Sequence, residues 1–264
     1  MIINISSRDN PLIKQYIKLR EQKKQRTADN RFVLEGARII SDAINEGVNI
    51  DFAFYTEDSV LRYPDTVERL VSACGDRAYI ITRDLAQRLS DTKGSQEIFC
   101  CAFALDKILS FDKINNGGKY LVLNNLQDPG NVGTILRTAD AVGVDGVFLC
   151  GCCDIYNPKT VRSTMGSLFR VPWCCDYSYP SVIDKLRECS VKTYASVIDK
   201  LAVDLKGHEF PKNCALVIGN EGKGLSEAEA ALCDERITIK MNGNIDSLNA
   251  AMAAGIFLWE MTKR

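Results

Sequence analysis

The sequence lacks most of the features that mark secreted, membrane-spanning or metal-binding chains. No apolar run among its 264 residues reaches the roughly 18 to 20 residues that cross a bilayer, and the first residues, MIINIS, have neither the charged beginning nor the long apolar stretch of a signal peptide. We therefore expect a cytoplasmic protein with no membrane partner. The chain has a single histidine, His208, so a zinc site with two or more histidine ligands is excluded.

Disulfides are also disfavoured, although the chain has eleven cysteines. Their number is odd and no secretory signal accompanies them, so a reduced state is expected. Cys150 and Cys153 form one CxxC pair, but a second pair is missing and Cys150 ends a strand-like run. We expect the cysteines to act mostly as small buried hydrophobic residues, and we predict no metal site.

The usual nucleotide-binding motifs are absent as well. The stretch VIGNEGKGLS, residues 217–226, fails both the P-loop and the GxGxxG spacing, which argues against a triphosphate, a dinucleotide and a nicotinamide-dependent oxidoreductase. Gly219, Gly222 and Gly224 nevertheless allow a ligand close to the backbone. The loop also holds a carboxylate, Glu221, which would repel a phosphate and so needs another explanation.

The net charge is only −1, but the N-terminal region is strongly basic. Residues 8–31 contain three acidic and eight basic residues, the latter being Arg8, Lys14, Lys18, Arg20, Lys23, Lys24, Arg26 and Arg31. Asn10 and Pro11 are typical of a helix start, and an apolar stripe follows them. This basic arm has two interpretations, a contact with a phosphate backbone or a solvated helix face, and both stay open here.

Strand-like and helix-like segments alternate along the rest of the chain, which predicts an α/β fold in two domains with a mostly parallel sheet. A smaller series covers residues 32–105, DKINNGGK at residues 112–119 is typical of a linker, and a second series begins at Tyr120. In the second series we expect strands at 120–123, 146–150, 169–173, 193–197, 214–218 and 236–240, and helices at 132–142, 158–165, 181–188, 226–233 and 247–262.

Ligands of such sheets bind beyond the carboxyl ends of the strands, so the loops that follow strands are candidate sites. In NNLQDPGNVGTILRTADAVG, residues 124–143, we expect Asn131 to cap a helix that carries Arg137. In IKMNGNIDSLNAAMAAG, residues 239–255, we expect Ser247 to cap a helix rich in small residues. Taken singly, Arg137 is also compatible with a surface ion pair, and the small residues with close helix packing.

These loops carry motifs in a fixed order along the chain: N-x-G-x-x-x-R at 131–137, G-N-E-G-x-G-L-S at 219–226, then I-x-M at 239–241 and S-L-N at 247–249. The set resembles the SpoU/TrmH branch of the SPOUT RNA methyltransferases, over about residues 119–264. The resemblance implies a C-terminal trefoil-knot domain at 119–264 and a homodimer. Residues 1–107, a basic arm or helix and a small α/β unit, resemble an RNA substrate-binding domain, and 108–118 would be the linker.

The resemblance also implies an activity, which is transfer of a methyl group from S-adenosylmethionine to a ribose 2′-hydroxyl of structured RNA. Ribosomal RNA is favoured over transfer RNA. The cofactor residues would be Gly219, Ile239, Met241 and Leu248. The catalytic residues would be Arg137, Asn131, Glu221, Ser247 and Asn249. The alternatives are a transfer-RNA 2′-O-methyltransferase and a non-catalytic RNA-binding protein of the same fold.

We also expect particular roles for Arg137 and Glu221, and one residue, Lys240, departs from the usual motif. Because a guanidinium has a pKa above about 12, we favour Arg137 as an orienting group and electrostatic stabiliser of the alkoxide over a literal base. Glu221 is expected to fix neighbouring backbone or Asn/Arg groups through charge-assisted hydrogen bonds. Lys240 stands where many relatives have proline, which leaves the fine shape of the pocket open.

Overall fold

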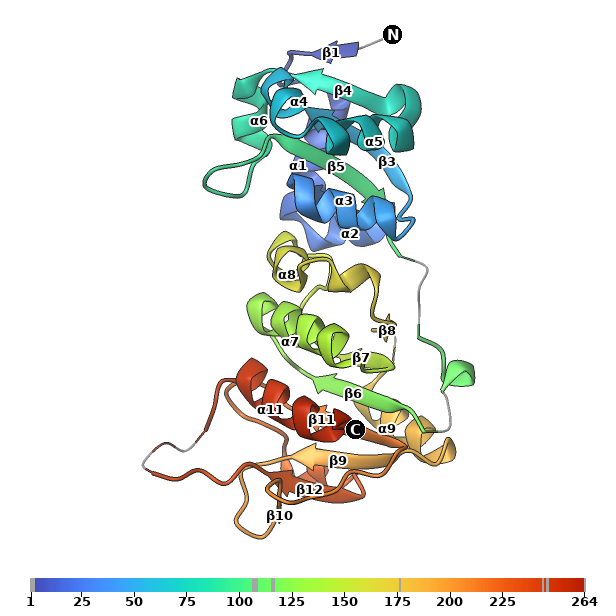
Figure 1. The fold of residues 1–264 in the computed structure, drawn as a ribbon, viewed down its shortest axis with the longest axis vertical. Coiled ribbons are helices and arrows are strands. Elements are labelled where there is room, and N and C mark those ends of the chain that lie inside the picture. The colour runs from blue at the N-terminus through green and yellow to red at the C-terminus, as the bar shows by residue number, and fades with distance from the viewer. Residues whose placement is uncertain are drawn as a thin grey trace. The chain divides into compact units, whose positions relative to one another are not determined.

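The structure is a computed structural model that describes residues 3–105, 109–114, 117–175, 177–243, 245 and 247–263. The chain forms two compact units (Figure 1). The first consists of Met1–Asp106 with Tyr156–Phe169, and the second of Lys107–Ile155 with Arg170–Arg264. Each unit combines a β-sheet with helices, so the predicted α/β class is confirmed.

The first unit contains a five-stranded mixed sheet. Its strands are β1 (Ile3–Ile5), β2 (Arg31–Glu35), β3 (Ile50–Tyr55), β4 (Ala78–Ile81) and β5 (Ile98–Phe103). They lie in the order β1-β4-β3-β5-β2, and β5 is antiparallel to both of its neighbours whereas the other pairs are parallel. β1 was not predicted, because it is a short strand with an exposed start that lies at the edge of the sheet.

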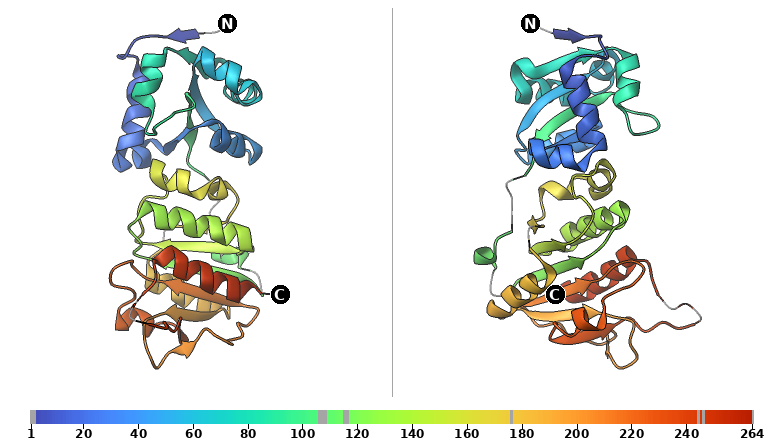
Figure 2. Two further views of the ribbon diagram at one scale, coloured as in Figure 1. Left: turned by 60° about the vertical axis from the view of Figure 1, so that its left-hand side comes forward. Right: turned by 180° about the vertical axis from the view of Figure 1, so that it is seen from behind.

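Helices cover both faces of this sheet. They are α1 (Pro11–Glu21), α2 (Lys23–Asp29), α3 (Ala37–Asn45), α4 (Glu57–Arg62), α5 (Pro64–Cys74) and α6 (Arg83–Leu89), with the 3-10 turn η1 (Gly75–Arg77) after α5. α1 and α6 lie on one face, and α3 and α5 lie on the other (Figure 2). The core on the first of these faces includes Tyr16, Phe54 and Phe99, and the Tyr16 ring makes T-shaped, edge-to-face contacts with the other two rings.

The basic segment is an integral part of this unit and is not a free arm. α1 buries Ile13, Tyr16 and Leu19 in the core, so its apolar stripe faces the sheet as its spacing predicts. The predicted start of α1 is confirmed, because the Asn10 side chain accepts a hydrogen bond from the Leu12 N–H at 2.9 Å. Arg26 is buried and donates to the Leu19 carbonyl at 2.6 Å, which satisfies an orphan carbonyl at the end of α1.

A segment that the sequence analysis grouped with the second domain packs in the first unit. It contains α8 (Pro158–Thr164) and the 3-10 turn η3 (Ser167–Phe169), and it lies against β2. Tyr156 stacks on Phe32 with 4.6 Å between ring centroids, and Arg162 pairs with Asp91 at 2.7 Å. Its buried side chains supply the physical reason, since Pro158 and Val161 need an apolar surface and β2 provides one.

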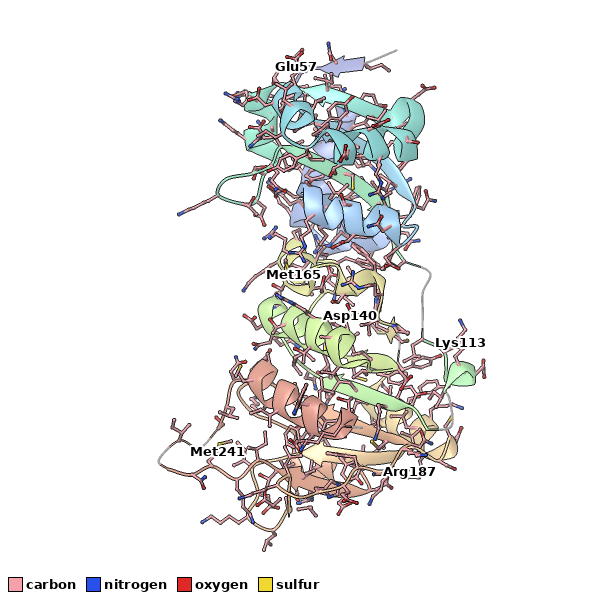
Figure 3. All side chains as sticks on the ribbon, in the orientation of Figure 1. Glu57, Lys113, Asp140, Met165, Arg187 and Met241 are labelled. Carbon is pink, nitrogen blue, oxygen red and sulfur yellow. The ribbon has the colours of Figure 1, made fainter. Side chains whose placement is uncertain are left out.

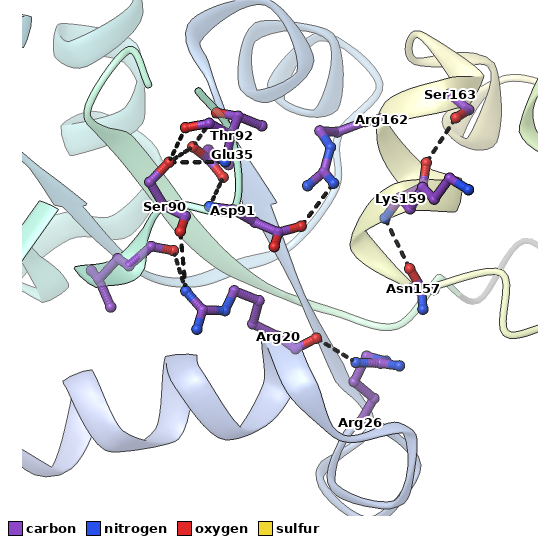
Figure 4. Close-up of polar contacts among 11 residues, drawn as sticks. Arg20, Arg26, Glu35, Ser90, Asp91, Thr92, Asn157, Lys159, Arg162 and Ser163 are labelled. Atoms are coloured by element: carbon purple, nitrogen blue, oxygen red, sulfur yellow. Dashed lines mark hydrogen bonds and ion pairs between the residues drawn. The ribbon is translucent and has the colours of Figure 1, made fainter. Parts of the chain in front are cut away.

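Residues 90–92 form the loop that pairs with α8, and Figure 4 shows the hydrogen bonds that hold this loop in place. Glu35, at the end of β2, accepts hydrogen bonds from the Ser90 hydroxyl at 2.6 Å and the Asp91 N–H at 2.9 Å. The Thr92 hydroxyl donates to the same carboxylate at 2.8 Å. Because the loop is held at three points, the Asp91 carboxylate is placed for its ion pair with Arg162.

The second unit contains a seven-stranded sheet. Its strands are β6 (Lys119–Asn124), β7 (Gly146–Cys150), β8 (Trp173–Cys174), β9 (Lys192–Ser196), β10 (Val203–Asp204), β11 (Cys214–Ile218) and β12 (Glu235–Thr238). They lie in the order β10-β12-β9-β11-β6-β7-β8 and every pair is parallel, so the predicted parallel sheet is confirmed. The trefoil knot stays a prediction.

Three helices sandwich the second sheet. α7 (Pro129–Val142) and α11 (Ala250–Thr262) pack against each other on one face, and α9 (Tyr179–Glu188) lies on the other (Figure 2). The short α10 (Glu227–Ala230) precedes β12. Because both faces are covered, β11 is buried along its whole length, which explains its uninterrupted apolar sequence CALVI.

Part of the predicted linker, residues 108–118, lies outside the described residues. Its described portion includes the 3-10 turn η2 (Phe111–Lys113) and packs in the second unit. Leu109 is buried and its N–H donates to the Trp173 carbonyl at 2.9 Å. Phe111 stacks on Phe148 with 5.0 Å between ring centroids. These residues therefore extend the core of the second unit.

Several predicted element boundaries are wrong, among them that of the helix predicted at 226–233, which is only α10. α7 begins at Pro129 and is capped by Asp128, whose side chain accepts from the Asn131 N–H at 2.9 Å, so Asn131 is not the cap. α11 is capped by Asn249 and not by Ser247, because the Asn249 side chain accepts from the Ala251 N–H at 2.9 Å. The strand predicted at 169–173 is reduced to β8, since η3 occupies its beginning.

Within the described ranges, no helix is long and apolar enough to cross a bilayer. The same residues contain no group of three or more His, Cys, Asp or Glu side chains that would hold a metal ion. No disulfide joins the eleven cysteines, all of which belong to the described part of the chain. Burial raises the pKa of Cys150 and of Cys152 to about 12, so both thiols stay protonated at neutral pH.

Candidate functional site

A pocket of about 410 Å³ opens at the carboxyl ends of β9, β11 and β12 in the second unit. Its volume lies in the roughly 300–1,000 Å³ range of small-molecule sites, and its place beyond the strand ends is where parallel sheets bind ligands. The four cofactor residues named from the sequence, Gly219, Ile239, Met241 and Leu248, all line it. Figure 3 marks Met241 on the segment between β12 and α11.

The glycine loop that follows β11 closes on itself. Asn220 and Gly224 form an isolated antiparallel bridge, in which the Gly224 N–H donates to the Asn220 carbonyl at 2.9 Å. The Asn220 side chain accepts from the N–H groups of Gly222 and Lys223 at 3.0 and 3.1 Å. The loop backbone is thereby shaped without help from a ligand.

Gly219 has no room for a side chain at the entrance of this loop. A Cβ there would lie 2.4 Å from the Gly224 carbonyl carbon and 2.5 Å from the Leu225 nitrogen, which are backbone atoms that cannot swing away. Gly224 has φ +63°, a left-handed conformation that glycine adopts without strain. The glycines therefore serve the tight closure of the loop, and the pocket wall at Gly219 is bare backbone.

Glu221 projects from the glycine loop to the loop that follows β6. Its carboxylate accepts hydrogen bonds from the N–H groups of Gln127, at 3.0 and 3.1 Å, and Asp128, at 2.9 Å. The side-chain amide of Asn131 donates to it at 3.3 Å. These are the backbone and Asn contacts that the sequence led us to expect.

The hydrogen bonds also set the charge of Glu221. Burial is the largest single influence and favours the neutral acid, but the N–H groups of Asp128 and Gln127 together with the Asn131 amide outweigh it. The net result is a pKa below that of an ordinary glutamate. Glu221 is therefore a carboxylate throughout the neutral range.

Asn131 connects Glu221 to the third motif. Its side-chain nitrogen donates to Glu221, so its side-chain oxygen is left to accept, and it does so from the Asn249 amide at 3.0 Å. The Asn249 oxygen in turn accepts from the N–H groups of Ala251 and Met252, in the first turn of α11. One chain of hydrogen bonds thus joins the three motifs.

The two remaining predicted residues, Ser247 and Arg137, are not part of this chain of hydrogen bonds. Ser247 lines the pocket, but Arg137 does not. Arg137 lies on α7, six residues after Asn131, with an exposed side chain that makes no ion pair or hydrogen bond to any described residue. The ion pair that could have explained Arg137 as a surface residue is thus not observed within the described part of the chain.

The pocket wall also carries charged residues that the sequence analysis missed. Arg236, on β12, pairs with Glu227 at the start of α10 and lies 3.7 Å from the Asp199 carboxylate. All three line the pocket, together with Glu221 and Lys223. The one feature of the sequence that could have pointed to Asp199 and Glu227 is their position after the ends of β9 and β11. Neither residue belongs to a motif that fixes its spacing from the strand.

Comparison with protein-family models identifies the chain. The model of the SpoU rRNA Methylase family matches residues 118–259, which is more than half of the sequence. The chain belongs to this family. A second model, the MRM3-like substrate binding domain, matches residues 10–100. The resemblance inferred from the motifs is therefore confirmed.

Individual relatives match nearly the whole chain. The 23S rRNA (guanosine(2553)-2′-O)-methyltransferase RlmP of Bacillus subtilis is 31% identical over 97% of this chain and 98% of its own. The 23S rRNA (uridine(2479)-2′-O)-methyltransferase of Streptomyces viridochromogenes is 30% identical over 98% and 92%. The crystal structure of an AdoMet-bound rRNA methyltransferase from Sinorhizobium meliloti superimposes with a TM-score of 0.86 and 29% identity, covering 98% and 97%.

The space at Gly219 gives a direct test of the pocket. We expect Gly219→Ala to push residues 224–225 out of place and to weaken S-adenosylmethionine binding by about tenfold or more, since backbone cannot yield to a Cβ at 2.4 Å. Gly222→Ala is the matched control, because its Cβ would meet nothing closer than the Asn220 side-chain oxygen at 3.7 Å. Calorimetric titration of both folded variants decides, and equal affinities would contradict the pocket assignment.

Proposed function

We propose that this protein transfers a methyl group from S-adenosylmethionine to a ribose 2′-hydroxyl of ribosomal RNA. One observation carries the proposal: the hydrogen-bonded chain Glu221–Asn131–Asn249 brings the three motifs together beside the pocket that contains all four expected cofactor residues. The names of the relatives from Bacillus and Streptomyces support this reaction and RNA class. Residues 119–264 would form the methyltransferase domain and residues 1–107 the RNA-binding one.

The pocket fits the proposed cofactor. Gly219 presents bare backbone to a ligand, and the Gly219 side of the wall admits no Cβ. Three carboxylates line the pocket against two basic side chains, so it favours a ligand with a positively charged reacting centre. When bound, S-adenosylmethionine supplies an electrophilic methyl group on its sulfonium. Gly219, Ile239, Met241 and Leu248 would hold it.

The chain's own residues would prepare the attacking hydroxyl. Arg137 offers several N–H donors in a fixed fork and, in the described residues, no acceptor occupies them, so it is available to orient a phosphate or the ribose oxygen. A guanidinium stays charged at every physiological pH, and its role is therefore to stabilise the developing alkoxide. Ser247 and Asn249 would position the ribose, while Glu221 and Asn131 hold the loops that carry these groups.

Substitution of Arg137 tests this assignment. We expect Arg137→Ala to keep S-adenosylmethionine affinity, because Arg137 does not line the pocket, and to reduce methyl transfer by about 100-fold or more. Arg137→Lys keeps the charge but loses the fork, so it should recover only part of the rate. The measurement is tritiated-methyl incorporation into ribosomal RNA, with the modified positions mapped across total RNA.

Either of two results would contradict the assignment. Full transfer by Arg137→Ala would remove Arg137 from the site. A 2′-O-methylation map that shows a transfer-RNA position and no ribosomal one would favour the alternative substrate, and an unchanged map would favour a non-catalytic RNA-binding protein.

The first unit supplies an RNA-binding surface in this proposal. Most basic side chains of residues 8–38 have structural partners, such as Asp84 for Arg8 and Asp51 for Arg31. Four basic side chains of this region have no ion-pair or hydrogen-bond partner among the described residues, and all four are exposed. They are Lys18, Lys23, Lys24 and Arg38. Free ammonium and guanidinium groups are the ones that can neutralise phosphates.

Removal of these charges should change the salt dependence of RNA binding. For the triple variant Lys18→Ala, Lys23→Ala, Lys24→Ala, we expect weaker binding and a log–log salt slope shallower by about two to three, because each lost phosphate contact removes roughly 0.7 to 0.9 from the slope. Lys14→Ala is the control, since its ammonium already pairs with Asp9 at 2.8 Å. Fluorescence anisotropy with a ribosomal RNA fragment measures both, and an unchanged slope would place the RNA elsewhere.

We also propose that the protein is a homodimer through α11. This helix is apolar on all sides: Ala254, Phe257 and Leu258 are buried, whereas Met252 and Trp259 are 62% and 64% exposed. An apolar helix face at a catalytic site is the kind of surface that a second copy covers. A second copy would at the same time enclose the site next to Ser247 and Asn249.

Charge on this face should therefore separate the protomers. We expect Trp259→Glu to be monomeric at micromolar concentration in sedimentation velocity, while the unmodified protein is dimeric. Leu61→Glu is the control, because Leu61 is 82% exposed on α4 and outside the proposed interface. A monomeric unmodified protein, or a dimeric Trp259→Glu variant, would refute the interface.

A further inference from the structure

One segment of the pocket wall is attached to the rest of the second unit, as far as the described residues show, by a single polar contact. Between β12 and α11 the chain runs through residues 239–243, where Ile239 and Met241 line the pocket. Within the described residues, the polar contact of this segment is the ion pair between Lys240 Nζ and Asp204 Oδ2, at 3.3 Å. The glycine loop, by contrast, is closed by its own hydrogen bonds.

The carboxylate that receives Lys240 is firmly placed. Asp204 belongs to β10, which pairs with β12 so that Asp204 lies opposite Thr238, and the Leu205 N–H donates to the Thr238 carbonyl at 2.8 Å. The other carboxylate oxygen of Asp204 accepts from the Lys206 N–H at 3.1 Å. That backbone contact, and then Lys240, hold the pKa of Asp204 below its usual value, so the carboxylate is charged at neutral pH.

Lys240 lies between Ile239 and Met241, which both line the pocket. A contact that restricts the position of the Lys240 side chain therefore also restricts the backbone of these two neighbours. Proline would limit the backbone there by fixing φ, whereas lysine leaves the backbone free and adds a long charged side chain. An ion pair to a fixed carboxylate is the means by which this chain can restrict the same segment. The edge strand β10 then acts as the support for the pocket wall.

We propose that the Lys240–Asp204 ion pair positions Ile239 and Met241 against S-adenosylmethionine and makes the affinity for this cofactor dependent on ionic strength. Lys240 is thus a positioning residue that does not itself touch the cofactor. The inference rests on the proposed function, which supplies the ligand. The side chains of Lys240 and Asp204 are 60% and 30% exposed, so salt screens their attraction.

The test is calorimetric titration of the full-length protein with S-adenosylmethionine, without RNA. It is carried out at about 0.1 M and about 1 M salt, between which the Debye length falls from roughly 10 Å to 3 Å. Lys240→Met keeps most of the length of the side chain and removes the charge. Asp204→Asn keeps an acceptor for the Lys206 N–H. Lys212→Met is the control, because Lys212 is exposed and has no partner among the described residues.

We expect each of the two single variants to bind about two- to fivefold more weakly than the unmodified protein at low salt, as an exposed ion pair allows. The double variant should be no weaker than either single one, because both remove the same interaction. High salt should weaken binding by the unmodified protein and by Lys212→Met to the same extent, and should weaken binding by Lys240→Met and Asp204→Asn less, because these two variants have already lost the ion pair that salt screens. A change in thermal stability alone would not produce this pattern.

Other outcomes overturn the inference or its premise separately. Unchanged affinity in Lys240→Met and Asp204→Asn, or an equal salt response in all variants, would overturn the positioning role while leaving the proposed function intact. No binding of S-adenosylmethionine by the folded, unmodified protein would overturn the proposed function itself.

Discussion

The arrangement of the site depends on the fact that a carboxylate accepts hydrogen bonds and cannot donate them. Every described group that forms a hydrogen bond with the Glu221 carboxylate is a donor. These donors are the N–H groups of Gln127 and Asp128 and the side-chain amides of Asn131 and Asn220. The Asn131 side-chain nitrogen therefore points to Glu221, and its side-chain oxygen is left to accept a hydrogen bond from the Asn249 amide. The first turn of α11 then follows, because the Asn249 oxygen is left to cap it. A single ionised group thereby orders segments that are about a hundred residues apart.

The two sides of the pocket obtain their shape by different means. The glycine loop is closed by backbone hydrogen bonds and by the exclusion of a Cβ at Gly219, and neither responds to salt or pH in the neutral range. The segment around Met241 has a contact between exposed charged side chains. A wall held by backbone hydrogen bonds and a wall held by one ion pair therefore face the same pocket.

Much of the architecture could be predicted from the sequence, because alternation of apolar runs reports which segments are strands and helices of a covered sheet. The motif residues could be named, and six of the nine predicted site residues line one pocket. The cap of α1 was predicted correctly from Asn10 and Pro11, but the caps of α7 and α11 were not. Asp128 and Asn131 are both good capping residues, and Pro129 at the first helical position favours Asp128. Asn131 instead contacts Glu221, which the sequence alone does not show. The packing of α8 on β2 was equally hidden, since periodicity shows that Val161 is buried but not against which strand.

The excursion of residues 156–169 means that the first unit is not a continuous stretch of sequence. Its β2 surface is completed by a piece of chain that is synthesised after β7 of the second unit. A fragment that ends at residue 106 would thus expose Phe32 where Tyr156 normally stacks, and would lose the partner of Asp91. A gene fragment cut at the junction after residue 106 would therefore encode an incomplete first unit.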